Sequence, residues 1–403
     1  MRGKILGIMK PAMEKDPELK LKYSERFFSL SNVQEYEEGT LECYRRFAVA
    51  DEKRALEEEL GEWIGADAGR RERWGSLLGD LDASYKAISE LKRDENYYRE
   101  CLVRGSSVFL VAVRLSGKMK QNWKSIHKLY SSLDMDLERR IFRCCLEEYL
   151  SNVSAKHLGP YQKELLQRFG SDWDAICSEV WDKSALSDPE RFGKLENCRE
   201  LCENDPLLRF YNDVKIVDFH KEEESLCRKD VLSLGREYTR ALYGMRLDKG
   251  IMQYPDANST MRLSYGRVCT LSPRDAVLLD WKTSVAGILQ KEEKDSYDFS
   301  LRKDWRDMLE TSPFCKRFNW NGEVDFLTDN DITGGNSGSP VLDSRGRLIG
   351  LAFDGNKESL AGDSSYTRDY NKSINVDIRY VLYVLGEYAG MERIITELGL
   401  RNW

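Results

Sequence analysis

Apolar residues recur at helical spacing through roughly the first 245 positions of the chain. Asp16-Pro17 has the form of a helix start, with a capping side chain followed by proline at the first helical position. Leu19, Tyr23 and Phe27 then follow at intervals of four, separated by charged residues. Such stripes are typical of faces that pack against other helices. Similar stripes run through residues 34–64, 81–91, 106–130, 134–152, 158–168 and 228–245.

The pattern changes from helical spacing to short alternating segments near Leu247–Gly250. Alternating segments bounded by turn residues predict β-strands. Asp343-Ser-Arg-Gly346 predicts a hairpin turn in which the glycine adopts a positive φ. The predicted strands are Thr260–Leu271, Val324–Thr328, Pro340–Leu342 and Arg347–Phe353.

Helical patterns return at the end of the chain, over Ile378–Ala389 and near Arg393–Leu398. We therefore predict an α+β protein with two domains. The first is an all-α domain over residues 1–247. The second, over residues 248–403, is a mixed β domain with peripheral helices.

The composition excludes several classes of protein. The 403 residues carry a net charge of −7, with 41% hydrophobic and 33% charged side chains. This balance fits a globular protein with a charged helical surface, and it argues against a nucleic-acid partner, for which a clustered basic face is expected. No apolar run reaches the roughly 20 residues that span a bilayer, so we expect no membrane span. The first residues do not have the form of a signal peptide.

Ten cysteines raise the question of a metal site or a disulfide framework. There is no Cys-x-x-Cys, and Cys198 and Cys202 are four residues apart with no histidine close by. This spacing favours buried small side chains and free thiols. A disulfide between distant cysteines stays open at this point. Nothing in the sequence implies a metal or an organic cofactor.

Residues 333–341 read Thr-Gly-Gly-Asn-Ser-Gly-Ser-Pro-Val, the pattern of a serine-peptidase nucleophile loop. Ser337 would be the nucleophile, and the amides of Ser337 and Gly335 would form the oxyanion hole. The glycines in this run permit backbone conformations that bulkier residues do not adopt. A predicted strand before the loop and a predicted hairpin after it favour this interpretation over an ordinary Gly/Ser-rich turn.

A serine needs a neighbouring base to act as a nucleophile at neutral pH. The sequence has only three histidines. His127 and His157 fall in helical segments, where we expect packed or surface roles. His220 lies closest to the β domain in sequence, but the residues around it do not resemble a catalytic histidine motif. The sequence therefore indicates a nucleophile without indicating its base.

The chain resembles the bacterial dipeptidyl peptidases 7 and 11, which are serine exopeptidases that remove dipeptides from free N-termini. The resemblance covers nearly the whole chain, and its most specific motifs lie after residue 250. Looser matches occur in the helical half, at Ile5–Met9, Asp16-Pro17 and Leu30–Asn32. The specific motifs are Tyr254–Asn258, Met261–Gly266, Asn330–Leu342, Gly350–Asn356 and Val376–Val381.

This resemblance implies a fold, a set of catalytic residues and a substrate class. The β domain would be the second barrel of a chymotrypsin-like peptidase, and the helical half would be the helical domain that this family inserts into its peptidase fold. The family's catalytic His and Asp lie in a first barrel upstream of the helical domain, so we expect that barrel to be absent from this chain. The resemblance also implies a peptide substrate with a free N-terminus and a periplasmic or extracellular location.

The resemblance further implies residues that recognise the substrate. In this family a glycine at the position of Gly355 leaves an apolar slot for the residue before the cut, whereas arginine attracts an acidic side chain. Gly355 and Phe353 therefore suggest a preference for hydrophobic residues. Asp354 would either cap the turn or help to shape the pocket. Asn32 best matches the asparagine that holds the substrate's amino group, although the residues after it depart from the family pattern.

Three interpretations are compatible with the sequence. The chain is the C-terminal part of a dipeptidyl peptidase and is inactive alone, or it is a pseudo-enzyme kept as a peptide-binding or interaction module. In the third, a separate chain supplies the His/Asp barrel. Where that barrel is missing, the face that it would cover exposes apolar surface, which favours self-association, for example as a homodimer.

Overall fold

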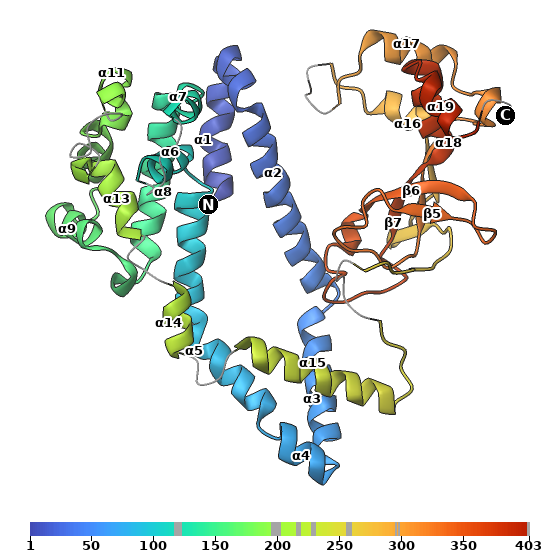
Figure 1. Ribbon diagram of the computed structural model, residues 1–403, viewed down its shortest axis with the longest axis horizontal. Helices are drawn as coiled ribbons and strands as arrows, with labels where there is room; N and C mark the ends of the chain where they lie inside the picture. The colour runs from blue at the N-terminus through green and yellow to red at the C-terminus, as the bar shows by residue number, and fades with distance from the viewer. Residues whose placement is uncertain are drawn as a thin grey trace. The chain divides into compact units, whose positions relative to one another are not determined.

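The structure is a computed structural model in which two compact units are formed (Figure 1). Unit 1 comprises Met1–Glu35 and Leu56–Gln253, and unit 2 comprises Tyr36–Ala55 and Tyr254–Trp403. The domain boundary expected between residues 247 and 248 stays a prediction. The structure describes residues 1–116, 123–194, 203–214, 219–226, 231–254, 260–294, 296 and 299–400.

Helices make up the described part of unit 1, as the apolar stripes predicted. Asp16 caps the helix that starts at Pro17, and its Oδ1 accepts the Glu18 N–H at 2.8 Å. The α-helices are α1 (Arg2–Lys15), α2 (Pro17–Arg46), α3 (Val49–Gly65), α4 (Ala68–Trp74), α5 (Leu77–Tyr97), α6 (Ser107–Ser116), α7 (Trp123–Ser131), α8 (Met135–Asn152), α9 (Pro160–Phe169), α10 (Trp173–Cys177), α11 (Pro189–Gly193), α13 (Pro206–Val214), α14 (Phe219–Leu226) and α15 (Val231–Asp248).

Unit 1 has two apolar cores. The larger one is built around α8, whose Phe142 and Tyr149 are fully buried, together with Ile5 of α1 and Phe210 of α13. The smaller one joins α3, α5 and α15, which lie next to one another in Figure 1. Its members come from all three helices: Leu60, Ile64, Leu77, Leu234, Ala241 and Met245.

The helical pattern predicted over residues 34–64 is interrupted by a sharp break. Helix α2 ends at Arg46, Ala48 has a φ of 49°, and α3 starts at Val49. A positive φ at a residue other than glycine ends a helix, because it directs the backbone out of the helical path. We call residues 36–55, which flank this break and belong to unit 2, the elbow.

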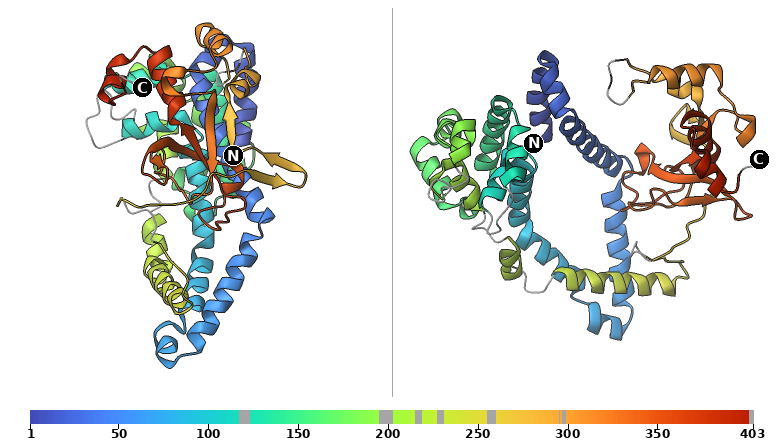
Figure 2. Two further views of the ribbon diagram at one scale, coloured as in Figure 1. Left: turned by 90° about the vertical axis from the view of Figure 1, so that its right-hand side faces the viewer. Right: turned by 45° about the horizontal axis from the view of Figure 1, so that its top comes forward.

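The centre of unit 2 is a five-stranded antiparallel sheet with the strand order β3-β4-β7-β6-β5. A separate hairpin, β1-β2, projects away from it (Figure 2, left). The predicted strands before and after the nucleophile loop are confirmed as β4, β5 and β6. The strands are β1 (Leu271–Arg274), β2 (Val277–Leu279), β3 (Lys282–Ser284), β4 (Glu323–Thr328), β5 (Pro340–Leu342), β6 (Leu348–Gly355) and β7 (Ser373–Asp377).

The predicted strand over Thr260–Leu271 does not form. Within it, Val268 makes only an isolated bridge to Thr328, and β1 begins at its last residue. Most of its apolar side chains are exposed, fully so at Met261 and by 89% at Leu263, whereas Leu271 at its end is buried. The alternation in this segment therefore has no partner strand within unit 2 to bury it.

A second set of helices covers one end of the sheet, as Figure 1 shows. Trp320 is 1% exposed there, and its ring stacks on Tyr383 with centroids 4.2 Å apart. The two C-terminal helices were predicted, and the first of them continues after Tyr383 as a π-helical turn. These helices are α16 (Val285–Gln290), α17 (Lys303–Thr311), α18 (Ile378–Tyr383) and α19 (Glu392–Glu397).

In the described part of the chain, each helix is too short or too polar to cross a membrane.

Candidate functional site

The loop that carries Ser337 connects β4 to β5 and is closed by its own hydrogen bonds. The Asn336 side chain accepts the Thr333 N–H at 3.0 Å, and the Asn336 N–H donates to the Thr333 carbonyl at 3.2 Å. The Ser339 N–H donates to the Asn336 carbonyl at 2.9 Å. This reciprocal pairing closes a turn between Thr333 and Asn336 through one backbone and one side-chain hydrogen bond, which holds a loop without regular secondary structure. We call residues 330–339 the nucleophile loop.

The two backbone N–H groups assigned to the oxyanion hole are those of Gly335 and Ser337. In the described residues, neither the Gly335 N–H nor the Ser337 N–H donates to a protein acceptor. The Asn336, Gly338 and Ser339 N–H groups all have acceptors. Gly335 has a φ of +101°, which L-residues rarely adopt, so the peptide groups around it take an orientation that a side chain would oppose. The loop therefore offers two unsatisfied donors beside the predicted nucleophile.

The end of β6 lies against Ser337. The Ser337 side chain is exposed, and its hydroxyl donates to the Phe353 carbonyl at 3.3 Å. The Gly338 N–H donates to the Ala352 carbonyl at 2.7 Å, and the Ala352 N–H donates to the Ser339 carbonyl at 3.0 Å. These bonds fix the serine beside the strand that the sequence associated with the substrate pocket.

Residues after Phe353 complete this part of the site. Asp354 Oδ1 accepts the Gly355 N–H at 2.8 Å, so its carboxylate caps the turn locally. A Cβ added at Gly355 would lie 2.4 Å from the Ser359 hydroxyl, which donates to the Asn356 carbonyl at 2.7 Å. The structure thus brings Ser337, Gly335, Phe353, Asp354 and Gly355 together on two adjoining segments.

The hairpin between β5 and β6 has the predicted turn. Gly346 has a φ of +76°, and its N–H donates to the Asp343 carbonyl at 2.9 Å. The Asp343 carboxylate accepts the N–H groups of Arg345 and Arg347, which holds its pKa below the usual value. The tight turn sets the register of the two strands that follow the nucleophile.

Asn32 lies elsewhere in the chain. It is part of α2 in unit 1, and its side chain is exposed. Its predicted role in holding the amino group of the substrate stays a prediction. Residues 255–258 of the Tyr254–Asn258 motif lie outside the described residues.

The three histidines belong to unit 1, and His127 and His157 have hydrogen-bond partners within that unit. His127 lies on α7 and shares a hydrogen bond with Ser131 at 3.1 Å. His157 is 1% exposed, and its two ring nitrogens lie 2.7 Å from Asp94 Oδ2 and 2.8 Å from Glu222 Oε1. His220 lies on α14. The packed role expected for His157 therefore agrees with its burial between two carboxylates.

Asp94 is expected to make unit 1 sensitive to acid. Burial alone would raise its pKa, but hydrogen bonds from Ser154 and His157 outweigh burial and hold the pKa below its usual value. The ionised carboxylate therefore stabilises the folded chain above the unfolded pKa of about 3.9, and this stability is lost as the pH falls through the folded pKa. We expect Asp94→Asn to lower the free energy of unfolding at pH 7 by about 2 kcal/mol.

The measurement is denaturant unfolding between pH 2.5 and pH 7. Asp94→Asn should reduce the loss of stability on acidification, because the variant has no carboxylate to protonate at this position. The control is Asp82→Asn, which removes an exposed carboxylate from the same helix. An unchanged acid dependence in Asp94→Asn would contradict the assignment.

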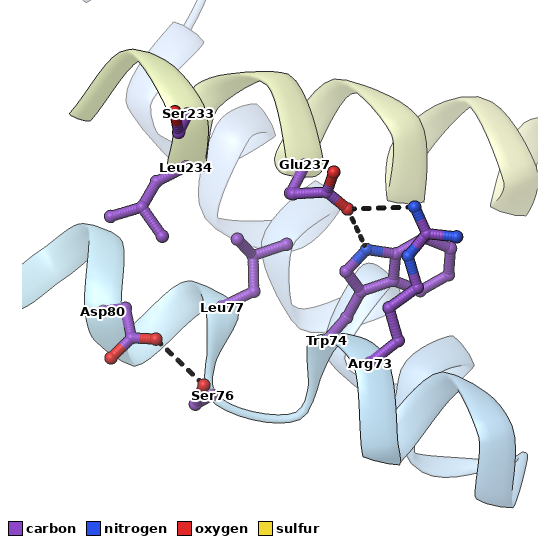
Figure 3. Close-up of a pocket in the computed structure, with 8 residues that line it drawn as sticks. All are labelled: Arg73, Trp74, Ser76, Leu77, Asp80, Ser233, Leu234 and Glu237. Atoms are coloured by element: carbon purple, nitrogen blue, oxygen red, sulfur yellow. Dashed lines mark hydrogen bonds and ion pairs between the residues drawn. The ribbon is translucent and has the colours of Figure 1, made fainter. Parts of the chain in front are cut away.

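A separate hollow of about 400 Å³ lies in unit 1 between α4, α5 and α15. Figure 3 shows Arg73 and Trp74 both reaching the Glu237 carboxylate, at 3.2 and 3.0 Å. Ser76 donates to Asp80 at 2.9 Å. None of the predicted site residues lines this hollow, and these polar groups of its wall bond to one another.

The described residues include no group of three His, Cys, Asp or Glu side chains that could hold a metal ion. The seven cysteines that the structure describes are free thiols, whereas Cys198, Cys202 and Cys227 lie outside the described residues. Burial raises the pKa of Cys101 to about 12 and that of Cys177 to about 11. These two thiols are therefore protonated and unreactive at neutral pH.

Sequence reasoning missed the residues that hold the nucleophile loop from outside. Thr333 Oγ1 donates to Asp363 Oδ1 at 2.8 Å, and Ser373 Oγ donates to the Asn330 carbonyl at 3.0 Å. Both partners lie more than 25 positions further along the chain, and no local pattern marks them. The motif predicted the nucleophile loop, but it did not predict the distant residues that bond to it.

Comparisons with known proteins agree on one family. A model of the Peptidase S46 family matches residues 1–400. The chain is 30% identical over 417 residues to dipeptidyl-peptidase 7 of Porphyromonas gingivalis, covering 99% of this chain and 58% of that protein. It is 29% identical over 423 residues to the Asp/Glu-specific dipeptidyl-peptidase of the same bacterium, again covering 99% and 58%.

Solved structures show the same likeness. The crystal structure of Porphyromonas endodontalis DPP11 matches with a TM-score of 0.83 at 24% identity, covering 100% of this chain and 60% of that chain. Its complex with the dipeptide Arg-Asp matches with a TM-score of 0.78 at 25% identity, covering 98% and 59%. The chain thus spans less than two thirds of the length of these relatives. Since the family model extends over nearly all of its residues, the chain belongs to the peptidase S46 family.

Proposed function

We propose that this chain is the nucleophile-bearing part of a serine-type dipeptidyl peptidase, which releases dipeptides from peptides with a free N-terminus. The observation that carries the proposal is the nucleophile loop, where the exposed Ser337 hydroxyl adjoins the Gly335 and Ser337 N–H groups that have no acceptor among the described residues. Two such donors beside a serine suit the stabilisation of an oxyanion. The dipeptidyl-peptidase relatives support the same reaction class.

The proposed chemistry is acyl transfer. Ser337 Oγ bonds to the carbonyl carbon after the second substrate residue, while a base takes the hydroxyl proton. The negative charge on the carbonyl oxygen is held by the N–H groups of Gly335 and Ser337. The amine of the remaining peptide then leaves with the proton, and water releases the dipeptide from the serine.

The base of this reaction comes from outside unit 2 in our proposal. The sequence of unit 2 contains no histidine, and the Ser337 hydroxyl contacts a backbone carbonyl rather than a base. We propose that a His/Asp-bearing β-barrel supplies it, either within a longer polypeptide or as another chain. The five-stranded sheet would then be part of the second barrel of a chymotrypsin-like fold.

Exposed apolar side chains of unit 2 support the proposal that a barrel docks there. Met261, Leu263 and Tyr265 are 100%, 89% and 69% exposed, and Leu278 on the β1-β2 hairpin is 71% exposed. Apolar patches of this kind mark protein interfaces. Self-association of this chain, as a homodimer, is the alternative way to cover the same side chains.

The proposed function is tested by combining the purified chain with the histidine-bearing barrel of an S46 relative and measuring dipeptide release from a peptide. We expect release only from the combination, because unit 2 contains no histidine to act as a base for Ser337. Light scattering of each sample separates the docked pair from a homodimer of this chain. Efficient release by the chain alone would contradict the external base, and no release from the combination would favour the alternative of a pseudo-enzyme that binds peptides.

Substrate preference is the finer part of the proposal. Gly355 and Phe353 would line an apolar slot for the residue before the cut, since the Phe353 side chain is 44% exposed at the end of β6. Asp354 would shape the turn beside it. Asn32 of unit 1 would hold the amino group of the substrate.

Gly355→Arg is expected to change this preference in the combined enzyme. A cation in the slot should lower kcat/KM for a hydrophobic residue before the cut by about tenfold to a hundredfold and raise it for Asp and Glu. The new side chain must also displace the Ser359 hydroxyl, which lies 2.4 Å from the position of the added Cβ.

The control for this experiment is Gly355→Met, which adds a side chain of similar length without charge. Methionine should fill the slot and lower the rate for hydrophobic residues, with no gain for acidic ones. An equal gain for Asp and Glu in both variants would show that the charge at this position does not set the preference.

We also propose a periplasmic or extracellular location, on the basis of the family resemblance alone. The buried Cys101 and Cys177 thiols, whose pKa burial raises, are protected from oxidation and are compatible with such a compartment.

A further inference from the structure

The segment between β6 and β7 contacts two parts of unit 2 that are distant in sequence. We call residues 357–371 the bracing loop. On one side it packs against the elbow, residues 36–55, and on the other it bonds to the nucleophile loop. All three segments belong to unit 2. The bracing loop is therefore placed to connect the helical elbow with the residues around Ser337.

An apolar cluster attaches the bracing loop to the elbow. Ala361 of the loop is 2% exposed and packs with Cys43 and Val49 of the elbow, each 4% exposed. Phe47 and Leu360 pack against the same cluster. Burial of these side chains holds the bracing loop in one position, because surface loops without such contacts open readily.

Aromatic and polar contacts surround this cluster. The Phe47 and Tyr370 ring centroids are 4.8 Å apart, and the Arg46 guanidinium lies 5.2 Å from each ring. The Tyr44 and Ser364 hydroxyls are 2.7 Å apart. The bracing loop thus contacts the elbow at three places along its length: at Ala361 near its start, at Ser364 in its middle and at Tyr370 near its end.

The opposite side of the bracing loop reaches the nucleophile loop and the strand before it. Thr333 Oγ1 donates to the Asp363 carboxylate at 2.8 Å. The Tyr366 hydroxyl donates to the Asp329 carbonyl at 2.7 Å. Thr333 is also the residue whose N–H and carbonyl bond to Asn336, so its side-chain bond holds the turn that orients Gly335 and Ser337.

The bracing loop also supports Gly355 at the end of β6. The Asn356 side chain donates to the Tyr370 carbonyl at 2.8 Å and accepts the Lys372 N–H at 2.8 Å. Ser359 Oγ occupies the space beside Gly355. One segment therefore fixes both the loop of the predicted nucleophile and the predicted pocket residue.

We infer that the bracing loop positions the nucleophile loop, and that Thr333 and Asp363 are the positioning residues through which the elbow holds Ser337 in place. This inference rests on the proposed function for its catalytic meaning, whereas the mechanical coupling does not depend on it. Neither residue touches the reacting atoms. The tests therefore measure whether a substitution in the elbow or the bracing loop changes the order of the nucleophile loop.

The first test measures amide hydrogen exchange of the nucleophile loop in the full chain. Thr333→Val keeps the shape of the side chain but removes its donor, and should raise exchange of the 333–339 amides about fivefold. Thr333→Ser keeps the donor and should restore the wild-type rate. Asp363→Ala should match Thr333→Val, and the double variant should exceed neither. Wild-type exchange in Thr333→Val, or additive effects in the double variant, would overturn the inference.

The second test perturbs the far end of the coupling. Val49→Ala removes volume from the cluster on the elbow, and should raise exchange in the bracing loop and in residues 333–339 alike. Val285→Ala is a matched control, because Val285 is also 4% exposed but belongs to the other apolar cluster of unit 2. It should leave both loops unchanged. An increase confined to the bracing loop, or equal increases in both variants, would overturn the coupling.

Failure of this inference can be told apart from failure of the proposed function. Exchange reports the order of the loop whether or not Ser337 is a nucleophile, and dipeptide release from the combined enzyme reports the nucleophile. If both hold, Thr333→Val should lower kcat of the combined enzyme and leave KM unchanged, since it misplaces Ser337 without altering the pocket. Rescue of kcat by Thr333→Ser completes the test.

Discussion

Ser337→Ala is expected to lower dipeptide release by the combined enzyme by about 10⁴-fold or more. Loss of the hydroxyl removes the atom that forms the acyl bond in the proposed mechanism. What rate remains would come from substrate binding and the two backbone donors. The substitution should not affect folding, because the Ser337 side chain is exposed and makes a single long hydrogen bond of 3.3 Å.

The matched control is Ser339→Ala, which removes a hydroxyl from the same loop two residues further on. The backbone N–H and carbonyl of Ser339 hold the loop, and both are kept in this variant. It should retain activity within about threefold, since the half-buried Ser339 hydroxyl makes no hydrogen bond to the described residues. If Ser337→Ala keeps more than a tenth of the wild-type rate, Ser337 is not the nucleophile.

Gly335→Ala is expected to lower kcat of the combined enzyme by about 10² to 10³-fold. The cause is conformational rather than steric, because a Cβ at this position would meet nothing within 4 Å. At a φ of +101° an L-residue is strained by roughly 1–3 kcal/mol, so the backbone should rotate towards an ordinary conformation. That rotation moves the N–H groups of residues 335 and 337 away from the oxyanion.

Gly334→Ala provides the comparison. A Cβ at Gly334 would also meet nothing within 4 Å, and Gly334 is not among the glycines with positive φ. The same methyl group should therefore change kcat by less than about threefold. Circular dichroism of both variants checks that the fold is kept. Equal losses in the two variants would mean that the conformation of Gly335 does not support the oxyanion site.

The local parts of the site could be predicted from the sequence because they are contiguous. Residues 333–341 form one motif, and the hairpin after it has a turn sequence with its glycine in the expected place. Helices such as α8 and α15 also follow from their own apolar stripes. In each case the residues that decide the structure lie within about one element of each other.

Strand β7 could not be predicted, although it lies at the centre of the sheet. Its buried positions are Ser373, Asn375 and Asp377, whereas Ile374 and Val376 are only partly buried. The Asn375 side chain donates to the Phe326 carbonyl and to Thr328 Oγ1, so the face is satisfied by hydrogen bonds. Ile374 and Val376 do alternate with these residues, but the buried face is the polar one, which reverses the pattern that predicts a strand.

The opposite error occurred at Thr260–Leu271, where a clear alternation did not give a strand. The alternation requires a partner to cover Met261 and Leu263, and unit 2 does not supply one. Contacts between residues that are far apart in the sequence could not be predicted from it either. The Cys43 thiol lies 3.4 Å from the Lys357 carbonyl, across 314 positions of sequence.

The elbow has a practical consequence for anyone who wishes to produce the β domain by itself. A gene fragment that starts at codon 248, where the sequence pattern changes, encodes strands β1 to β7 but omits residues 36–55. Such a fragment would expose Ala361, Leu360 and Tyr370, which the elbow covers in the intact chain. A recombinant β domain should therefore carry residues 36–55 as a fused or co-expressed peptide.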